Sequence, residues 1–270
     1  LQLYTGLVAQ LHGCASPAAD PTTAAAAIAA VDRESAAKLV GCLEVATAVH
    51  HSLASQDLPA FFEDHIKEWM ALMLAALRYV HPQLGGDADD PPGELEGLHC
   101  TVVEAVSLYT SKYEEEFAPF LADFVQLIWS MLVAAGLGSR HDKLATTAIK
   151  FLTLVATSVH HKLFEQGAAL KEVCERIVIP NMQLLPADEE MFEDDPAEYI
   201  RRDIEGSDAD TRRRVACELV RGLCRNYEQQ VGAIFGNYVT AMLAQHAAAP
   251  AASWKAKDVA IYLVTDLSLR

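Results

Sequence analysis

The eight residues AIKFLTLV at 148–155 recur as a pattern twice further along the chain. The segments ACELVRGL at 216–223 and AIYLVTDL at 260–267 again place a small residue one helical turn before a bulky apolar pair, and a weaker copy begins at Ala105. On a helix, the small residue admits a close neighbour and the large residues fill its grooves. The last two copies are one repeat of roughly 40–47 residues apart, the length of HEAT and armadillo units. The sequence therefore predicts an all-α HEAT-repeat α-solenoid, in which antiparallel helix pairs stack into a superhelix.

Helical periodicity continues through nearly the whole chain, and no alternating run indicates a strand. Breaks fall at glycine and proline, which predicts helices at 1–13, 33–54, 58–79, 94–112, 114–135, 141–158, 168–184, 209–226, 229–247 and 254–270. We interpret the chain as one continuous array and a piece of a longer protein. Its predicted units are the end of a preceding repeat at 1–13, helix pairs at 33–79, 94–135, 141–184 and 209–247, a charged insertion at 185–208, the start of the next repeat at 254–270, and a low-complexity segment at 14–32.

The composition narrows the class of partner. Half of the 270 residues are hydrophobic, and the formal net charge is −16. This charge argues against nucleic acid, which needs a basic face, and against an anionic membrane surface. It favours partners with basic patches. Keeping an apolar protein soluble explains the acidity equally well.

The cysteines and apolar runs exclude further classes. The six cysteines form no C-x-x-C pair, which is typical of buried thiols in a reducing compartment rather than of a disulfide framework. No uncharged apolar run is long enough to cross a bilayer, and the longest candidate, residues 69–77, is too short. We therefore expect no membrane insertion.

The sequence offers little support for catalysis. The histidine pairs at 50–51 and 160–161 are neighbours in sequence, so on a helix they project roughly 100° apart and do not easily share a metal ion. The glycines at 136 and 138 do not complete a dinucleotide-binding motif, and the chain has no P-loop or nucleophile elbow. We expect no enzyme, no cofactor and no metal site.

Residues 58–70, LPAFFEDHIKEWM, have a broad apolar face opposite acidic and basic side chains. This pattern favours a core helix over a helix that lines a binding groove, although it allows both.

The most distinctive stretch is the charged insertion with the helix that follows it. An acidic run precedes two arginines, and three more arginines open the next helix, where Arg213, Arg214 and Arg221 are expected to lie mainly off the buried stripe. The arginines either neutralise the acidic run and pin the insertion to the scaffold, or form with it a two-signed docking surface. The candidate partner-binding residues are Glu189, Glu190, Glu193, Asp194, Asp195, Glu198, Arg201, Arg202, Asp203, Asp208, Asp210, Arg212, Arg213 and Arg214.

Several segments together resemble one known family. They are LPAFFEDHIKEWM at 58–70, EEEFAPFLADFVQLIW at 114–129, IVIPNM at 177–182, EEMFEDDPAEYIRRDIEGSDADTRRRVACELVRGL at 189–223 and SWKAKDVAIYLV at 253–264. The chain is similar over about 35–270 to the CAS-type exportins of the karyopherin-beta family, which return importin-alpha to the cytoplasm. TTAIKFLT and TSVHHKLF within 146–164 are most similar to green-lineage members.

The resemblance implies part of a nuclear export receptor. It would bind Ran-GTP and importin-alpha cooperatively, carry importin-alpha from nucleus to cytoplasm and release both when GTP is hydrolysed. Such a protein shuttles through the nuclear envelope, with nucleoporins as plausible further partners, and catalyses nothing itself. In the family, the insertion touches both GTPase and cargo and is linked to closing of the free ring. The alternative is a generic helical-repeat scaffold for protein–protein interactions in another pathway, and a helical enzyme is a third reading.

Overall fold

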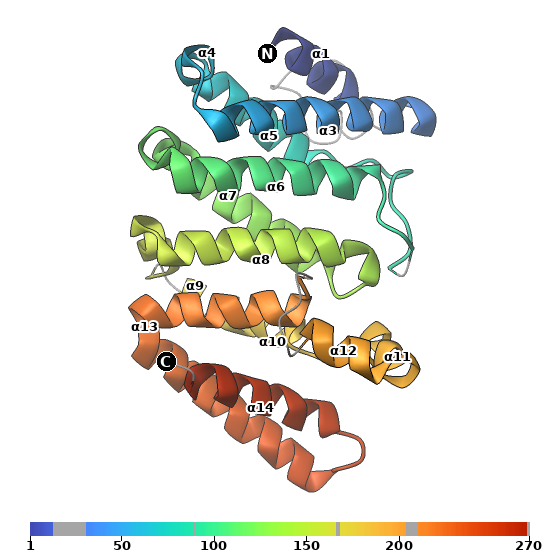
Figure 1. Cartoon of the computed structure of the whole chain (residues 1–270), viewed down its shortest axis with the longest axis vertical. Helices are drawn as coiled ribbons and strands as arrows, with labels where there is room; N and C mark the ends of the chain where they lie inside the picture. The colour runs from blue at the N-terminus through green and yellow to red at the C-terminus, as the bar shows by residue number, and fades with distance from the viewer. Residues whose placement is uncertain (13–30, 89, 166–167, 204–209, 269–270) are drawn as a thin grey trace. The chain divides into compact units, whose positions relative to one another are not determined.

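The computed structural model describes residues 1–12, 31–88, 90–165, 168–203 and 210–268. Within these ranges the regular structure is helical and contains no strand (Figure 1). The chain divides into two compact units, one formed by residues 1–131 and 138–147 and the other by residues 132–137 and 148–270. Most of the predicted low-complexity segment lies outside the described residues.

The first unit contains α1 (Gln2–Leu11), α3 (Arg33–Gln56), α4 (Ala60–Asp64), α5 (Ile66–Arg78), α6 (Glu94–Lys112), most of α7 (Glu114–Ala135), the short 3-10 helix η1 (Ser139–His141) and the start of α8 (Asp142–Thr157). The helices predicted at 94–112 and 114–135 are α6 and α7. The prediction of one helix over 58–79 is wrong, because the backbone leaves the helical region at His65 (φ −113°, ψ 23°) and separates α4 from α5.

Local capping explains where the long helices of this unit begin. The Asp32 carboxylate accepts the backbone N–H of Ser35 at 3.0 Å and so caps α3. At the start of α6, the Glu96 carboxylate accepts the backbone N–H of Gly93 at 2.9 Å. Each bond satisfies a backbone donor that the first turn of a helix leaves without a partner. The two capped helices, α3 and α6, pack side by side and run in the same direction, since Lys112 at the end of α6 donates to the carbonyls of Ser55 and Gln56 at the end of α3 (Figure 1).

A buried arginine holds the loop between α5 and α6. Arg140 is 6% exposed, and its guanidinium donates to both carboxylate oxygens of Glu96, at 2.6 and 3.1 Å, and to the carbonyls of Leu84 and Pro91. Burial by itself would raise the pKa of Glu96, but the hydrogen bonds from Arg140 and from the backbone hold that pKa below its ordinary value. One side chain therefore ties the polar loop to the first turn of α6.

The helix α7 has one buried stripe, formed by Phe117, Leu121, Phe124, Ile128 and Leu132. Their spacing of three or four residues is that of an amphipathic helix facing a core. By length and composition alone, α7 is the one helix among the described residues that could cross a membrane. The expectation that residues 69–77 form the longest such stretch is therefore wrong. The buried stripe accounts for only part of the apolar character of α7, because 28% of its most apolar window is buried.

The second unit contains the rest of α8, the 3-10 helix η2 (Val159–Glu165), α9 (Ala169–Val173), the π-helix η3 (Cys174–Val178), α10 (Ile179–Asn181), α11 (Pro186–Asp194), α12 (Pro196–Asp203), α13 (Arg212–Ala248) and α14 (Trp254–Ser268). The helix predicted at 168–184 is divided by the π-turn. Pro180 has no N–H to donate and crowds the carbonyl four residues before it, which the wider π-turn accommodates.

Two helices predicted at 209–226 and 229–247 are joined in α13. The predicted break is observed as a kink at Tyr227, whose backbone is non-helical (φ −132°, ψ 32°). The Tyr227 hydroxyl donates to the carbonyl oxygen of His161 at 2.8 Å and lies 2.7 Å from His161 Nδ1. These contacts hold the kink against η2.

The repeated motif is at the centre of the helix packing. The four motif positions of 148–155 and of 216–223 are fully buried. At Gly222, an added Cβ would lie 3.2 Å from Thr157 and 3.3 Å from Thr153, so α13 approaches α8 more closely there than a larger side chain would allow. In the third copy Val264 is 52% exposed, because one face of α14 has no neighbour within the described structure.

The imidazole of His50 is buried in an aromatic stack. It is 2% exposed, stacks on Phe62 at 4.3 Å between ring centroids, and also contacts Trp69. Its Nε2 atom lies 3.0 Å from the Tyr109 hydroxyl oxygen. Burial lowers the pKa of His50 from 6.5 to about 4. Packing thus explains a histidine that could have suggested a metal ligand.

The His50 stack predicts a pH dependence of stability. The imidazole is protonated near pH 6.5 in the unfolded chain but only near pH 4 in the folded chain, because its folded-state pKa is depressed. The free energy of unfolding therefore decreases as the pH falls from about 6.5 to about 4. Between about pH 7 and pH 4.5 we expect the wild type to lose roughly 2–3 kcal/mol more than His50→Phe. Urea unfolding at both pH values measures this difference.

The control for this experiment is Tyr109→Phe. It removes the hydroxyl near Nε2 but keeps the imidazole buried, so it should retain the pH dependence of the wild type. Equal pH dependence in His50→Phe and the wild type would contradict the assignment.

Candidate partner-binding surface

The predicted insertion contains two short helices that the sequence analysis did not predict. Pro186 and Pro196 occupy the first positions of α11 and α12, where a missing N–H has no cost. The Asp188 carboxylate accepts the backbone N–H of Leu185, and the Asp195 carboxylate accepts that of Glu198, both at 3.0 Å. These capping signals were present in the sequence, but the density of charge concealed them.

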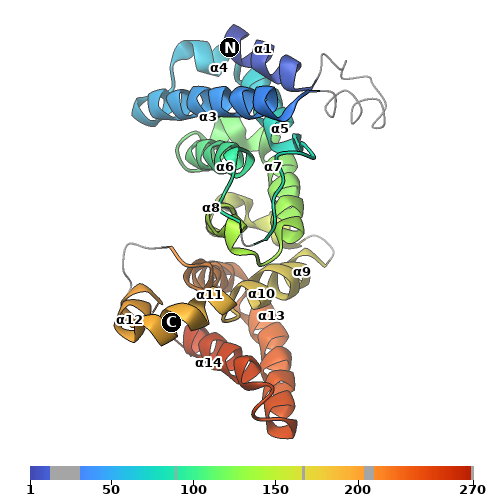
Figure 2. The same cartoon turned by 90° about the vertical axis from the view of Figure 1, so that its right-hand side faces the viewer.

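The two helices pack together as a hairpin (Figures 1 and 2), and several of its acidic side chains are exposed to solvent. We call α11 and α12 together the acidic hairpin. Its exposed acids are Glu190, Glu193, Asp194 and Asp195. Among them Phe192 is 49% exposed and meets Tyr199 edge to face at 5.5 Å between centroids. The hairpin thus presents negative charge around an aromatic ring, a combination suited to a basic surface with apolar side chains.

The first arginine after the hairpin is an internal residue. Arg212 is 5% exposed, and its Nη1 atom donates to the Gly136 carbonyl at 2.8 Å and to Asn181 Oδ1 at 3.2 Å. It therefore joins the start of α13 to α10 and to the turn that follows α7. Burial disfavours direct contact of this side chain with a partner.

The second arginine is also internal, which corrects the expectation that Arg213 lies off the buried stripe. Arg213 is 5% exposed, forms an ion pair with Asp258 at 2.6 Å, and lies over the Tyr262 ring at 4.2 Å. Further along α13, Arg221 forms an ion pair with Asp266 at 2.7 Å. The reason is that α14 packs on a second face of α13. The apolar stripe in the sequence predicts only the face of α13 that packs through apolar residues, and not the polar face that packs against α14.

The remaining candidates are on the surface or close to it. Arg214 is half-buried, with its Nε 3.7 Å from Glu218 one turn along the helix. Glu198 pairs with Arg201 within α12, Asp210 pairs with Lys150 of α8, and Arg202 donates to the Met191 sulfur at 3.7 Å.

Of the others, Glu189 pairs with Lys255 of α14. Asp203 is the last residue of α12, and Asp208 lies outside the described residues. The predicted set thus includes exposed acids of the hairpin, two buried arginines, and residues such as Glu189 and Asp210 that pair with neighbouring elements.

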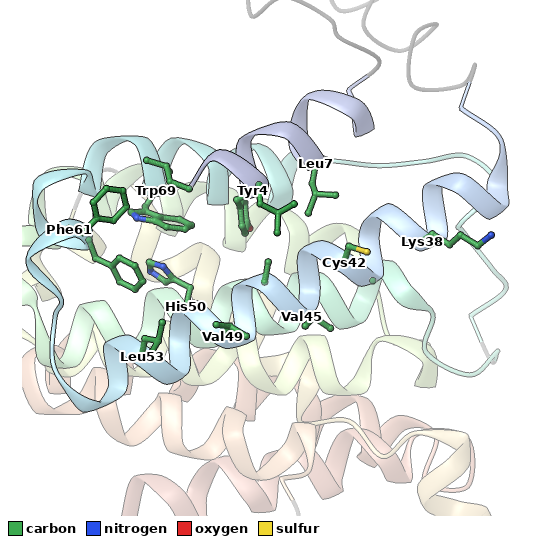
Figure 3. A pocket seen from close by; sticks show the side chains of 15 residues that line it. Tyr4, Leu7, Lys38, Cys42, Val45, Val49, His50, Leu53, Phe61 and Trp69 are labelled. Atoms are coloured by element: carbon green, nitrogen blue, oxygen red, sulfur yellow. The ribbon is translucent and has the colours of Figure 1, made fainter.

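An apolar groove lies on the first unit, over α1, α3 and the segment 58–70 (Figure 3). Its volume is about 770 Å³. Leu3, Val45, Val49, Leu53 and Phe61 line it with exposed fractions between 51% and 72%. The core reading of 58–70 is confirmed for Trp69 and Met70, which are buried, while Phe61 lines the groove; that the groove binds a partner stays a prediction.

Several of the described thiols are buried. Burial raises the pKa of Cys100 to about 11 and that of Cys174 to about 12, which keeps both thiols protonated and weakly nucleophilic. Cys42 is exposed, contrary to the expectation of buried thiols. No group of three or more His, Cys, Asp or Glu side chains suited to a metal ion occurs in the part of the chain that the structure describes.

Comparisons with known proteins agree with the architecture. Exportin-2 of Drosophila melanogaster is 46% identical over 233 residues, which are 86% of this chain and 24% of that protein. Exportin-2 of Homo sapiens is 46% identical over 231 residues, 85% of this chain and 24% of that protein. The chain therefore spans about a quarter of the length of the curated relatives it matches.

A solved structure confirms the predicted fold class. The exportin Cse1 in its cargo-free, cytoplasmic state matches 87% of this chain and 26% of its own, with a TM-score of 0.84 and 35% sequence identity. The fold is accordingly an all-α HEAT-repeat α-solenoid. The family model described as Cse1 matches residues 8–270, and the chain therefore belongs to the Cse1 family.

Proposed function

We propose that the protein to which this chain belongs is a nuclear export receptor that binds Ran-GTP and importin-alpha cooperatively and carries importin-alpha from nucleus to cytoplasm. The observation that carries the proposal is the match to the Cse1 family over residues 8–270. The relatives named exportin-2, and the exportin Cse1 in its cargo-free state, support it. Cooperative binding requires a scaffold whose conformations differ in affinity for each ligand, and helical repeats provide one.

The acidic hairpin is the proposed contact surface within this chain. Its four solvent-facing acids are available to a partner, whereas Arg212 and Arg213 are committed to internal contacts. In this proposal the acids meet basic patches on the GTPase or the cargo, and the buried arginines fix the helix that follows the hairpin. The net charge of −16 supports basic proteins rather than nucleic acid as partners.

The proposed function also implies passage through the nuclear envelope and no catalytic activity of the receptor itself. A receptor that carries cargo between nucleus and cytoplasm must pass the nuclear envelope, so nucleoporins are proposed partners as well. Hydrolysis of GTP belongs to the GTPase, and the receptor itself is proposed to catalyse no reaction and to need no cofactor. Its role is to make the binding of two proteins mutually dependent.

Cooperative binding is the first expected outcome. In titrations of the full-length protein, importin-alpha should tighten Ran-GTP binding by roughly 5- to 150-fold, and Ran-GTP should tighten importin-alpha binding by the same factor. Ran-GDP is the control and should show no such coupling. Tight binding of both proteins without mutual strengthening would contradict an export receptor.

Neutralising the acidic hairpin should weaken this complex. In the full-length protein, the combined substitutions Glu190→Gln, Glu193→Gln, Asp194→Asn and Asp195→Asn should slow association roughly tenfold at low salt and reduce its salt dependence. Stopped-flow association at two ionic strengths measures both effects. The unfolding temperature should stay close to that of the wild type, because the four side chains are exposed and an asparagine at position 195 can still cap α12.

A matched control removes the same charge elsewhere on the chain. Glu63→Gln, Glu115→Gln, Glu116→Gln and Asp123→Asn neutralise four other exposed acids. If the two variants slow association equally, the effect belongs to net charge rather than to the hairpin.

The two readings of the arginines predict different effects of charge reversal. Arg213→Glu would place a carboxylate beside Asp258 in a buried site, so the free energy of unfolding should fall by roughly 3–5 kcal/mol. The adjacent Arg214→Glu, at a half-buried position, should cost about 1 kcal/mol. Denaturant unfolding of the chain measures both. Similar losses for the two variants would show that Arg213 is no more structural than its neighbour.

A further inference from the structure

Lys255 connects the acidic hairpin to the first turn of α14. Its Nζ atom pairs with the Glu189 carboxylate and donates to the Leu184 carbonyl at 3.3 Å. We propose that Lys255 is a positioning residue, which fixes the direction of the acidic hairpin and so presents its exposed acids to a partner. The inference rests on the proposed function and assigns Glu189 to an internal contact, apart from the other acids of the run.

The hairpin needs external support because its own interior is small. No residue of α11 is buried, and α11 and α12 have only nine and eight residues. Helices of this length are not stable alone in water, since too few hydrogen bonds offset the cost of nucleation. The Phe192–Tyr199 contact joins the two helices to each other but not to the scaffold. The direction of the hairpin therefore depends on its ties to neighbouring elements.

Lys255 acts on both sides of the point where the hairpin begins. Leu184 precedes Pro186, the first residue of α11, and Glu189 lies in the first turn of that helix. An ammonium group has three donors, so it can hold a backbone carbonyl and a carboxylate at the same time. With the carbonyl and the carboxylate both fixed, the path of the chain through Leu185 is restricted. The angle between α10 and α11 is restricted with it.

The helix that carries Lys255 is itself firmly held. Asp258 and Asp266 of α14 form ion pairs with Arg213 and Arg221 of α13, at 2.6 and 2.7 Å. Positions 255, 258, 262 and 266 follow one another at three- and four-residue intervals, so they share one face of α14. That face contacts both the hairpin and α13. The position of the hairpin thus depends on the packing of α14 against α13, because α14 carries Lys255.

The expected effect is geometric more than energetic. The side chains of Lys255 and Glu189 are 39% and 36% exposed, and such ion pairs contribute modestly to stability. In the full-length protein, Lys255→Glu and Glu189→Lys should each speed amide hydrogen exchange over residues 186–203 by roughly two- to fivefold. Each should also weaken the complex with Ran-GTP and importin-alpha by a similar factor. The double charge swap should restore both quantities in part, because it restores the ion pair but a carboxylate at position 255 cannot donate to the Leu184 carbonyl.

The control is Lys257→Glu, an equal change of charge at an exposed position on the same helix. It should alter neither readout. Unchanged exchange in Lys255→Glu would overturn the positioning role, because the hairpin would then be held by other contacts. A swap that restores exchange but not affinity would also overturn it, since Glu189 would then touch the partner directly. If the wild-type protein binds neither Ran-GTP nor importin-alpha, the export proposal is refuted. The hydrogen-exchange measurement would still decide the role of Lys255.

Discussion

An inner helix of a stacked array must satisfy neighbours on two sides, and this constraint shapes the second unit. The first half of α13 meets α8 where Gly222 lies close to Thr153 and Thr157, and it meets α14 where Arg213 and Arg221 pair with aspartates. The first contact is close and apolar, and the second is ionic. A helix with two such faces has little surface left for a partner. This explains why an arginine cluster that resembles a docking site is largely internal.

The same constraint explains the helix faces that no neighbouring helix covers within the described structure. In a solenoid each repeat is covered by the next, so an uncovered helix face shows apolar residues that would elsewhere be core. The groove lined by Val45, Val49 and Phe61 has this character, and so does the face of α14 that exposes Val264. The acidic hairpin differs in kind, because its exposed surface is charged. Charge and exposure together make it the better candidate for recognition of another protein.

Much of this fold follows from periodicity in the sequence, and the exceptions have a common cause. A period near 3.6 predicts α6 and α7 with the observed bounds, and the repeated alanine motif predicts buried positions in α8 and α13. Periodicity does not say which helix lies beyond a polar face, so the burial of Arg213 could not be predicted. The helices of the hairpin were missed for another reason. Their caps and prolines are local signals, and their apolar residues are too few to form a stripe.

The kink at Tyr227 has a mechanical consequence. Because α13 continues on both sides of one non-helical residue, no flexible linker absorbs a change of angle between its halves. The part of α13 beyond Tyr227 has roughly twenty residues, so it is a rigid arm about 30 Å long. A rotation of about 10° at this one residue would move the tip of the arm by about 5 Å. Because the contacts of Tyr227 with His161 fix the kink, they also fix where the far end of this arm lies.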